Sequence, residues 1–212
     1  MRTLIALILL WHIPVQTLAD GEPAGEFDYY VLALSWSANW CEREGDEKGA
    51  KQCMRGKNYG WVVHGLWPQY EEGYPEYCET DKPGPTNLEI MKMTGIMPDV
   101  DLIKHQWKKH GTCSGYMGLE YFVLTQEAWK RVNRPEVLRK IKAPMKVPAS
   151  VVEDAFLEVN PKLTRDAITI TCRDGMIQEA RICLTRGLEP RTCGEDVIKD
   201  CTMKDALLMP IR

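Results

Sequence analysis

The stretch FDYYVLALSW at residues 27–36 decides the fold class, and the remaining elements can be placed outward from it. Its aromatic and branched side chains are typical of a buried β-strand. WVVHGL at 61–66 predicts a second strand. Two alternating runs between 167 and 184 flank Arg-Asp-Gly at 173–175, which predicts a β-hairpin. The sheet should therefore contain at least one antiparallel pair.

Helical patterns lie between these predicted strands. We expect helices at 86–97, 100–110, 118–132 and 151–159, the last with Ser150 and Glu153 as a capping box. The segment 71–85 is rich in Gly, Pro and charge, and predicts a loop. Because strands and helices are interspersed, we expect one α+β domain, with a central, mostly antiparallel sheet flanked by several helices and bonded by disulfides.

The first residues are typical of an export signal. Arg2 supplies a positive charge, residues 4–11 an apolar core, and Thr-Leu-Ala at 17–19 a small-residue cleavage pattern. This apolar run is too short to span a bilayer, and no later stretch is long and apolar enough. We therefore expect a signal peptide at 1–19, a mature domain at 20–212, and a protein that is periplasmic or extracellular. A buried N-terminal helix is the less favoured alternative.

Charge and cysteine content narrow the function classes. The chain has a formal net charge of −3. Cleavage of the predicted leader would remove one positive charge and leave the mature chain slightly more acidic. An acidic protein does not coat nucleic acid through its overall field, so any nucleic-acid binding must come from a small local site. An even number of cysteines in an exported protein predicts four disulfides, although spacing alone leaves the pairing open. No CxxC is present, so a zinc ribbon and a thioredoxin-like site lack their signature. The eight cysteines are Cys41, Cys53, Cys78, Cys113, Cys172, Cys183, Cys193 and Cys201.

All histidines beyond the predicted leader lie in two short segments, WVVHGLWPQ at 61–69 and HQWKKHGTC at 105–113. The second segment predicts a helix that ends at Gly111 in the left-handed conformation. Side chains four apart share a helix face, so His105 should align with Lys109 and Gln106 with His110. One surface would then hold two imidazoles, an ammonium and an amide.

This group of side chains suits acid–base chemistry better than metal binding. His105 and His110 are five residues apart, whereas a metal-binding pair on one helix needs a spacing of four. We therefore expect no metal and no cofactor. Two histidines can act as general base and general acid, and a lysine can stabilise negative charge on a phosphorane. Attack of a ribose 2′-OH on its own 3′-phosphate needs only this equipment, and DNA, which lacks the 2′-OH, should be inert.

The two histidine segments resemble the paired active-site signatures of the ribonuclease T2 family. HGLWP at 64–68 matches the first signature in full, and HQWKKHGTC matches the second, usually HEWxKHGTC, at every fixed position but one. The resemblance implies a metal-independent endoribonuclease that cleaves single-stranded RNA to 2′,3′-cyclic phosphates. It also implies the disulfides Cys78–Cys113, Cys172–Cys201 and Cys183–Cys193, which leave Cys41–Cys53 as the fourth. Separately, we expect a monomer.

The resemblance also assigns a role to each matching position. His64 and His110 fall on the two catalytic histidines, with His110 as base toward the 2′-OH and His64 as acid toward the 5′-oxygen. His105 falls on a phosphate-binding residue, Lys109 on the residue that stabilises the pentacoordinate centre, and Trp67 on a tryptophan that contacts a base. The motifs leave the direction of proton transfer, the base preference and the biological role open.

Gln106 is the one departure, because the family usually has Glu there. An amide can still hydrogen-bond a phosphate oxygen but carries no charge. Its neutrality should favour the uncharged form of His110, so we expect an active enzyme in which His110 titrates lower than in a Glu-bearing relative. The alternative is a secreted RNA-binding or signalling protein with the same fold and weakened catalysis. A metal-dependent phosphodiesterase is a second, weaker rival.

Overall fold

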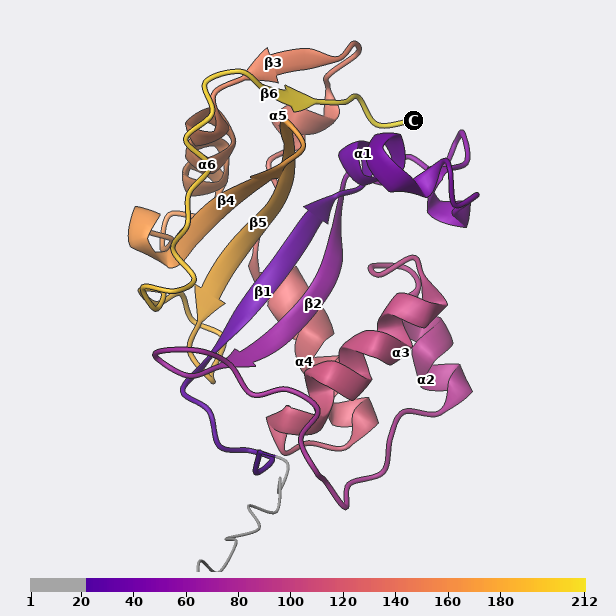
Figure 1. The fold of residues 1–212 in the computed structure, drawn as a ribbon, viewed down its shortest axis with the longest axis vertical. Helices are drawn as coiled ribbons and strands as arrows, with labels where there is room; N and C mark the ends of the chain where they lie inside the picture. The colour runs from indigo at the N-terminus through magenta and orange to yellow at the C-terminus, as the bar shows by residue number, and fades with distance from the viewer. Residues whose placement is uncertain (1–21) are drawn as a thin grey trace, which may run out of the picture.

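A six-stranded sheet forms the centre of the protein (Figure 1). The computed structural model describes residues 22–212, and the predicted signal peptide lies outside them. The strands are β1 (Tyr29–Trp36), β2 (Trp61–Gln69), β3 (Met145–Val147), β4 (Ile168–Arg173), β5 (Met176–Leu184) and β6 (Ala206–Leu208). The helices are α1 (Ser37–Trp40), α2 (Asn87–Met93), α3 (Val100–Lys109), α4 (Gly118–Arg131), α5 (Glu136–Arg139) and α6 (Ala149–Val159).

The strand pairing is antiparallel except at one place. β1 lies between β2 and β5, β4 pairs with β5, and β3 pairs with β6, all antiparallel. Only the short pairing of β5 with β6 is parallel. The predicted fold class, α+β in one domain with a mostly antiparallel sheet, is confirmed.

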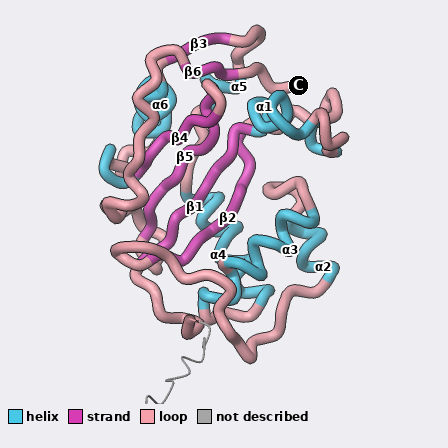
Figure 2. The backbone as a smooth tube through the Cα atoms, viewed as in Figure 1, coloured by secondary structure: helices cyan, strands magenta, loops and turns pink. Residues whose placement is uncertain are grey.

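Both faces of β1 are buried, which explains its almost continuous apolar sequence. Alternate side chains of a strand point to opposite faces. Tyr30, Leu32 and Leu34 join the main core, to which α2, α3, α4 and α6 contribute side chains. Tyr29 and Val31 join a smaller core on the other face with Cys183, Cys193 and Val197. In Figure 2, α2 and α3 lie beside β2 and α6 lies beside β4, so helices flank the sheet at both of its edges, and their buried side chains join the one main core.

The predicted long elements are present, with small shifts at their ends. The hairpin of β4 and β5 turns at Asp174 and Gly175, both with positive φ, as a two-residue hairpin turn requires. The first predicted helix ends early, at Met93, where the hydroxyl of Thr94 donates to the Met91 carbonyl at 2.8 Å. The short elements α1, α5, β3 and β6 were not predicted, because three or four residues show no periodicity.

Two local predictions were wrong. Ser150 and Glu153 form no capping box: α6 begins at Ala149, after Pro148, and Glu153 instead pairs with Arg165 at 3.1 Å. Gly111 is not left-handed, because the chain continues into a 3₁₀ turn, Gly111–Ser114, and the left-handed residue is Gly115 (φ 77°). Gly111 is needed for space instead, since a Cβ there would lie 2.4 Å from the Trp107 ring.

All eight cysteines form disulfides. The pairs are Cys41–Cys53, Cys78–Cys113, Cys172–Cys201 and Cys183–Cys193. The last three are the pairs that the family resemblance implied, and the first is the pair that remained. Four disulfides are typical of proteins from oxidising compartments. No helix within 22–212 is long and apolar enough to cross a membrane.

Candidate active site

A β-bulge in β2 sets the direction of the His64 side chain. β1 and β2 pair in register up to Ala33 with Gly65, and the register then shifts so that Leu34 pairs with Val63. His64 is the extra residue at this shift. A bulge changes the alternation of side chains along a strand. As a result His64 and Trp67, three residues apart, reach the same cavity, while Val63 and Leu66 both enter the main core.

Gly65 leaves room for a hydrogen bond that holds Trp67. The indole Nε1 of Trp67 donates to Oε1 of Gln106 at 2.7 Å, and Gln106 is only 3% exposed. A Cβ at Gly65 would lie 2.2 Å from both of these atoms. The glycine of the HGLWP segment is therefore required by this contact between β2 and α3, and the amide of Gln106 fixes the tryptophan.

The end of α3 brings three of the predicted residues to the same place. His105, Lys109 and His110 line one cavity of about 380 Å³ together with His64 and Trp67. The rings of His64 and His110 both lie 5.3 Å from the Trp67 ring, measured between centroids. The predicted alignment along the helix is thus observed, with His105 exposed and Gln106 and His110 buried.

His110 lies in surroundings that disfavour its charged form. It is 6% exposed, and its Nδ1 has no hydrogen-bond partner among the described residues. Burial, and then the charges of Lys109, His64 and His105, lower the pKa of His110 to about 3. The imidazole is therefore neutral at physiological pH. Burial, rather than the lysines, is the main cause, and the effect expected of Gln106 stays a prediction.

The loop at 71–85 closes over the end of α3. The carboxylate of Glu76 pairs with Nζ of Lys109 at 3.0 Å, and this hydrogen bond raises the pKa of Lys109. The Tyr74 ring lies 5.6 Å from the same Nζ and 6.2 Å from the His110 ring. The Cys78–Cys113 disulfide ties the loop to the turn after α3. Sequence reasoning predicted this loop but not that Tyr74 and Glu76 would belong to the site.

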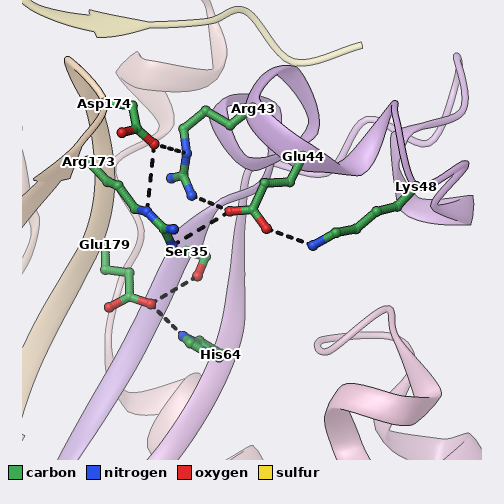
Figure 3. Close-up of polar contacts among 8 residues, drawn as sticks. All are labelled: Ser35, Arg43, Glu44, Lys48, His64, Arg173, Asp174 and Glu179. Atoms are coloured by element: carbon green, nitrogen blue, oxygen red, sulfur yellow. Dashed lines mark hydrogen bonds and ion pairs between the residues drawn. The ribbon is translucent and has the colours of Figure 1, made fainter.

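A second cavity adjoins the first. It measures about 570 Å³ and shares His64 and His105 with the smaller cavity. Its wall carries charges of both signs. Arg43, Lys48 and Arg173 form a network with Glu44 and Asp174 (Figure 3), and Asp99, Asp101 and Glu179 also line this cavity. A substrate lying across both cavities would pass the two shared histidines, with binding space on either side.

Two further residues of the site come from β5. Glu179 contacts Nδ1 of His64, and Arg181 pairs with Glu179 at 2.9 Å while its guanidinium lies 5.4 Å from the Trp67 ring centroid. Sequence reasoning missed both. The available signal was a pair of charged residues at alternating positions of a mostly apolar strand, MIQEARICL.

The cavities suit acid–base chemistry on an anionic substrate. Within residues 22–212, no three His, Cys, Asp or Glu side chains are grouped so that they could hold a metal ion. The polar and aromatic lining of the smaller cavity consists of three imidazoles, the ammonium of Lys109, the guanidinium of Arg181, the rings of Trp67 and Tyr74, two amides and the carboxylate of Asp196. Among these groups, the imidazoles can move protons, the cations can contact phosphate oxygens and the aromatic rings can stack on bases.

Comparison with known proteins identifies relatives over most of the chain. Residues 27–193 match the Ribonuclease T2 family. A ribonuclease of Aeromonas hydrophila is 32% identical over 203 residues, which cover 92% of this chain and 90% of that protein. Among solved structures, RNase NT in complex with 5′-AMP superposes with a TM-score of 0.68 at 20% identity, over 88% of this chain and all of that one. An RNase-related protein from Calystegia sepium gives a TM-score of 0.64 at 23% identity, over 88% of this chain and 98% of the other.

Proposed function

The chain belongs to the ribonuclease T2 family, and from this premise we propose that it is an exported, metal-independent endoribonuclease for single-stranded RNA. The observation that carries the proposal is the shared cavity, in which His64 and His110 both lie against Trp67, with Lys109 and His105 beside them.

The proposed reaction is an internal transesterification. His110 takes the proton of the ribose 2′-OH as the 2′-oxygen bonds to phosphorus. His64 gives a proton to the 5′-oxygen as the bond between phosphorus and that oxygen breaks. The products are a 2′,3′-cyclic phosphate and a free 5′-OH. Burial lowers the pKa of His110 and keeps the ring neutral, and a general base must be in its neutral form before it accepts a proton.

The other cavity residues have roles that fit their positions. Lys109 supplies positive charge to the pentacoordinate phosphorus. His105 lies exposed where the two cavities meet and contacts the phosphate. Trp67, fixed by Gln106, offers its ring for base stacking. The predicted leader of the chain and its four disulfides support export to the periplasm or the medium. We infer a monomer.

The test is cleavage of polyuridylate and of a dinucleoside phosphate in EDTA, with analysis of the product ends. The wild type should yield 2′,3′-cyclic phosphates and leave DNA intact. His64→Ala and His110→Ala should each lose about 10²–10⁴-fold in rate. Lys108, exposed and outside both cavities, provides the matched control: Lys108→Ala should cleave like the wild type, whereas Lys109→Ala should not.

Each rival function gives a different result in this assay. Binding of polyuridylate without cleavage would contradict the enzyme and indicate the RNA-binding protein. Activity that EDTA abolishes would indicate the metal-dependent phosphodiesterase. Cleavage that survives His110→Ala would refute the two-histidine mechanism.

A further inference from the structure

A buried carboxylate lies behind the proposed catalytic acid. Glu179, in the middle of β5, is 1% exposed. Its Oε1 contacts Nδ1 of His64 and accepts a long hydrogen bond from the hydroxyl of Ser35 at 3.4 Å. Its Oε2 accepts from Nε of Arg181 at 2.9 Å. Figure 3 shows Glu179 with dashed contacts to Ser35 and His64. Both carboxylate oxygens are therefore satisfied.

The strand register makes this contact between non-adjacent strands possible. β1 separates β2 from β5. Ala33 of β1 pairs with Gly65 on one side and with Arg181 on the other, and Ser35 pairs with Glu179. Small side chains at these two positions of β1 leave space above the strand. The bulge at His64 turns the imidazole into that space, where it meets the carboxylate.

The carboxylate is ionised at neutral pH. Burial raises the pKa of Glu179, but the hydrogen bond and charge of His64 and the charge of Arg181 outweigh it, so the pKa falls to about 2. A buried charge is costly unless it is paired. Arg181 pairs with one oxygen and His64 with the other, so the contact with His64 is part of what stabilises the buried charge.

We propose that Glu179 is the positioning residue of the proposed acid: it accepts the Nδ1–H of His64 and holds the ring with Nε2 free for the leaving oxygen. This inference rests on the proposed function. When His64 gives its Nε2 proton to the 5′-oxygen, the ring keeps the Nδ1 proton, and Glu179 stays ionised throughout. The carboxylate thus fixes the tautomer and orientation of the ring and balances its positive charge before transfer.

The alternative is that Glu179 serves only as a counter-ion that folds Arg181 into the sheet. The two roles differ in one measurable respect. A residue that acts through the acid matters only when the leaving group needs a proton. A residue that only supports the fold affects every substrate alike.

The decisive experiment compares two substrates on Glu179→Gln. The first is a dinucleoside phosphate, whose alkoxide leaving group needs protonation. The second is a uridine 3′-aryl phosphate with a 4-nitrophenolate leaving group, which departs without a proton. We expect kcat for the dinucleoside to fall about 10–100-fold, as part of the contribution of a general acid, with little change in KM. For the aryl ester we expect a change of less than about threefold. Equal losses on both substrates, or no loss on either, would overturn the proposal.

Three controls keep the result interpretable. Glu153→Gln neutralises another buried carboxylate with an arginine partner, one that lines neither cavity, and should leave both rates unchanged. In a His64→Ala background, Glu179→Gln should have almost no further effect on the dinucleoside, because residues that act as a unit are not additive. Multiplicative losses would contradict the inference. Glu179→Asp keeps the charge beside Arg181 but shortens its reach, and should show the same leaving-group dependence if the amide variant does not fold.

Failure of the proposed function would look different. It would appear as a wild type that does not cleave the dinucleoside, or as a His64→Ala variant that cleaves it normally. Failure of the Glu179 inference leaves the His64→Ala loss intact and removes only the selective loss in Glu179→Gln.

Discussion

Gly65→Ala tests whether close packing of β2 against α3 builds the site. The added methyl group would lie 2.2 Å from Oε1 of Gln106 and 2.2 Å from Nε1 of Trp67. The amide is 3% exposed and cannot move into solvent, so the 2.7 Å hydrogen bond between the two residues must break. Leaving a buried donor and acceptor unpaired costs about 1–3 kcal/mol, and overpacking adds a similar amount.

We expect a loss of about 3 kcal/mol in the free energy of unfolding, or roughly 6–12 °C in Tm for a domain of this size. Thermal unfolding followed by circular dichroism measures the shift, and cleavage of a dinucleoside should fall because Trp67 is displaced. Gly95→Ala is the matched control, since a Cβ there meets nothing within 4 Å and its φ is not positive. A Gly65→Ala protein that melts within a degree of the wild type would refute the steric argument.

Two further changes should have separable effects. Replacing Cys78 and Cys113 by Ala removes a disulfide that spans 35 residues. The loss of this cross-link should lower the free energy of unfolding by about 4 kcal/mol, because the unfolded chain regains loop entropy. Urea unfolding measures this loss, and an unchanged urea midpoint would contradict the loop-entropy argument. Gln106→Glu places a carboxylate beside His110, whose pKa is now lowered to about 3. The negative charge favours the imidazolium of His110, so the acidic limb of the pH–rate profile should move to higher pH. A profile that does not move would contradict the hypothesis that the neutral Gln106 favours the uncharged form of His110.

The helical half of the site could be predicted because helix geometry is local. The spacing of His105, Lys109 and His110 fixes their relative directions on α3 without knowledge of the rest of the fold. The structure places all three in one cavity. The burial of His110 was not predictable in the same way, since it depends on the loop at 71–85 and on Trp67.

The strand half of the site depends on features that sequence periodicity hides. Strict alternation would put His64 and Trp67 on opposite faces of β2, because they are three residues apart. The bulge at His64 reverses this, and Gly65 was its only visible sign. Glu179 follows His64 by 115 residues, and its position depends on which strands flank β1. That order is set by long-range packing, which composition and spacing do not specify.

The contrast between the two imidazoles supports a direction for the proton transfers that the sequence left open. His110 is buried among positive neighbours with an unpartnered Nδ1, and is therefore kept neutral. His64 is half-buried and has an ionised carboxylate on its Nδ1, which balances a positive ring. A neutral, buried ring suits the proposed base, and an ionised carboxylate on Nδ1 suits a histidine that delivers a proton from Nε2. If the roles were reversed, an aryl leaving group would rescue His110→Ala and not His64→Ala, so the comparison proposed for Glu179 also decides between the two histidines.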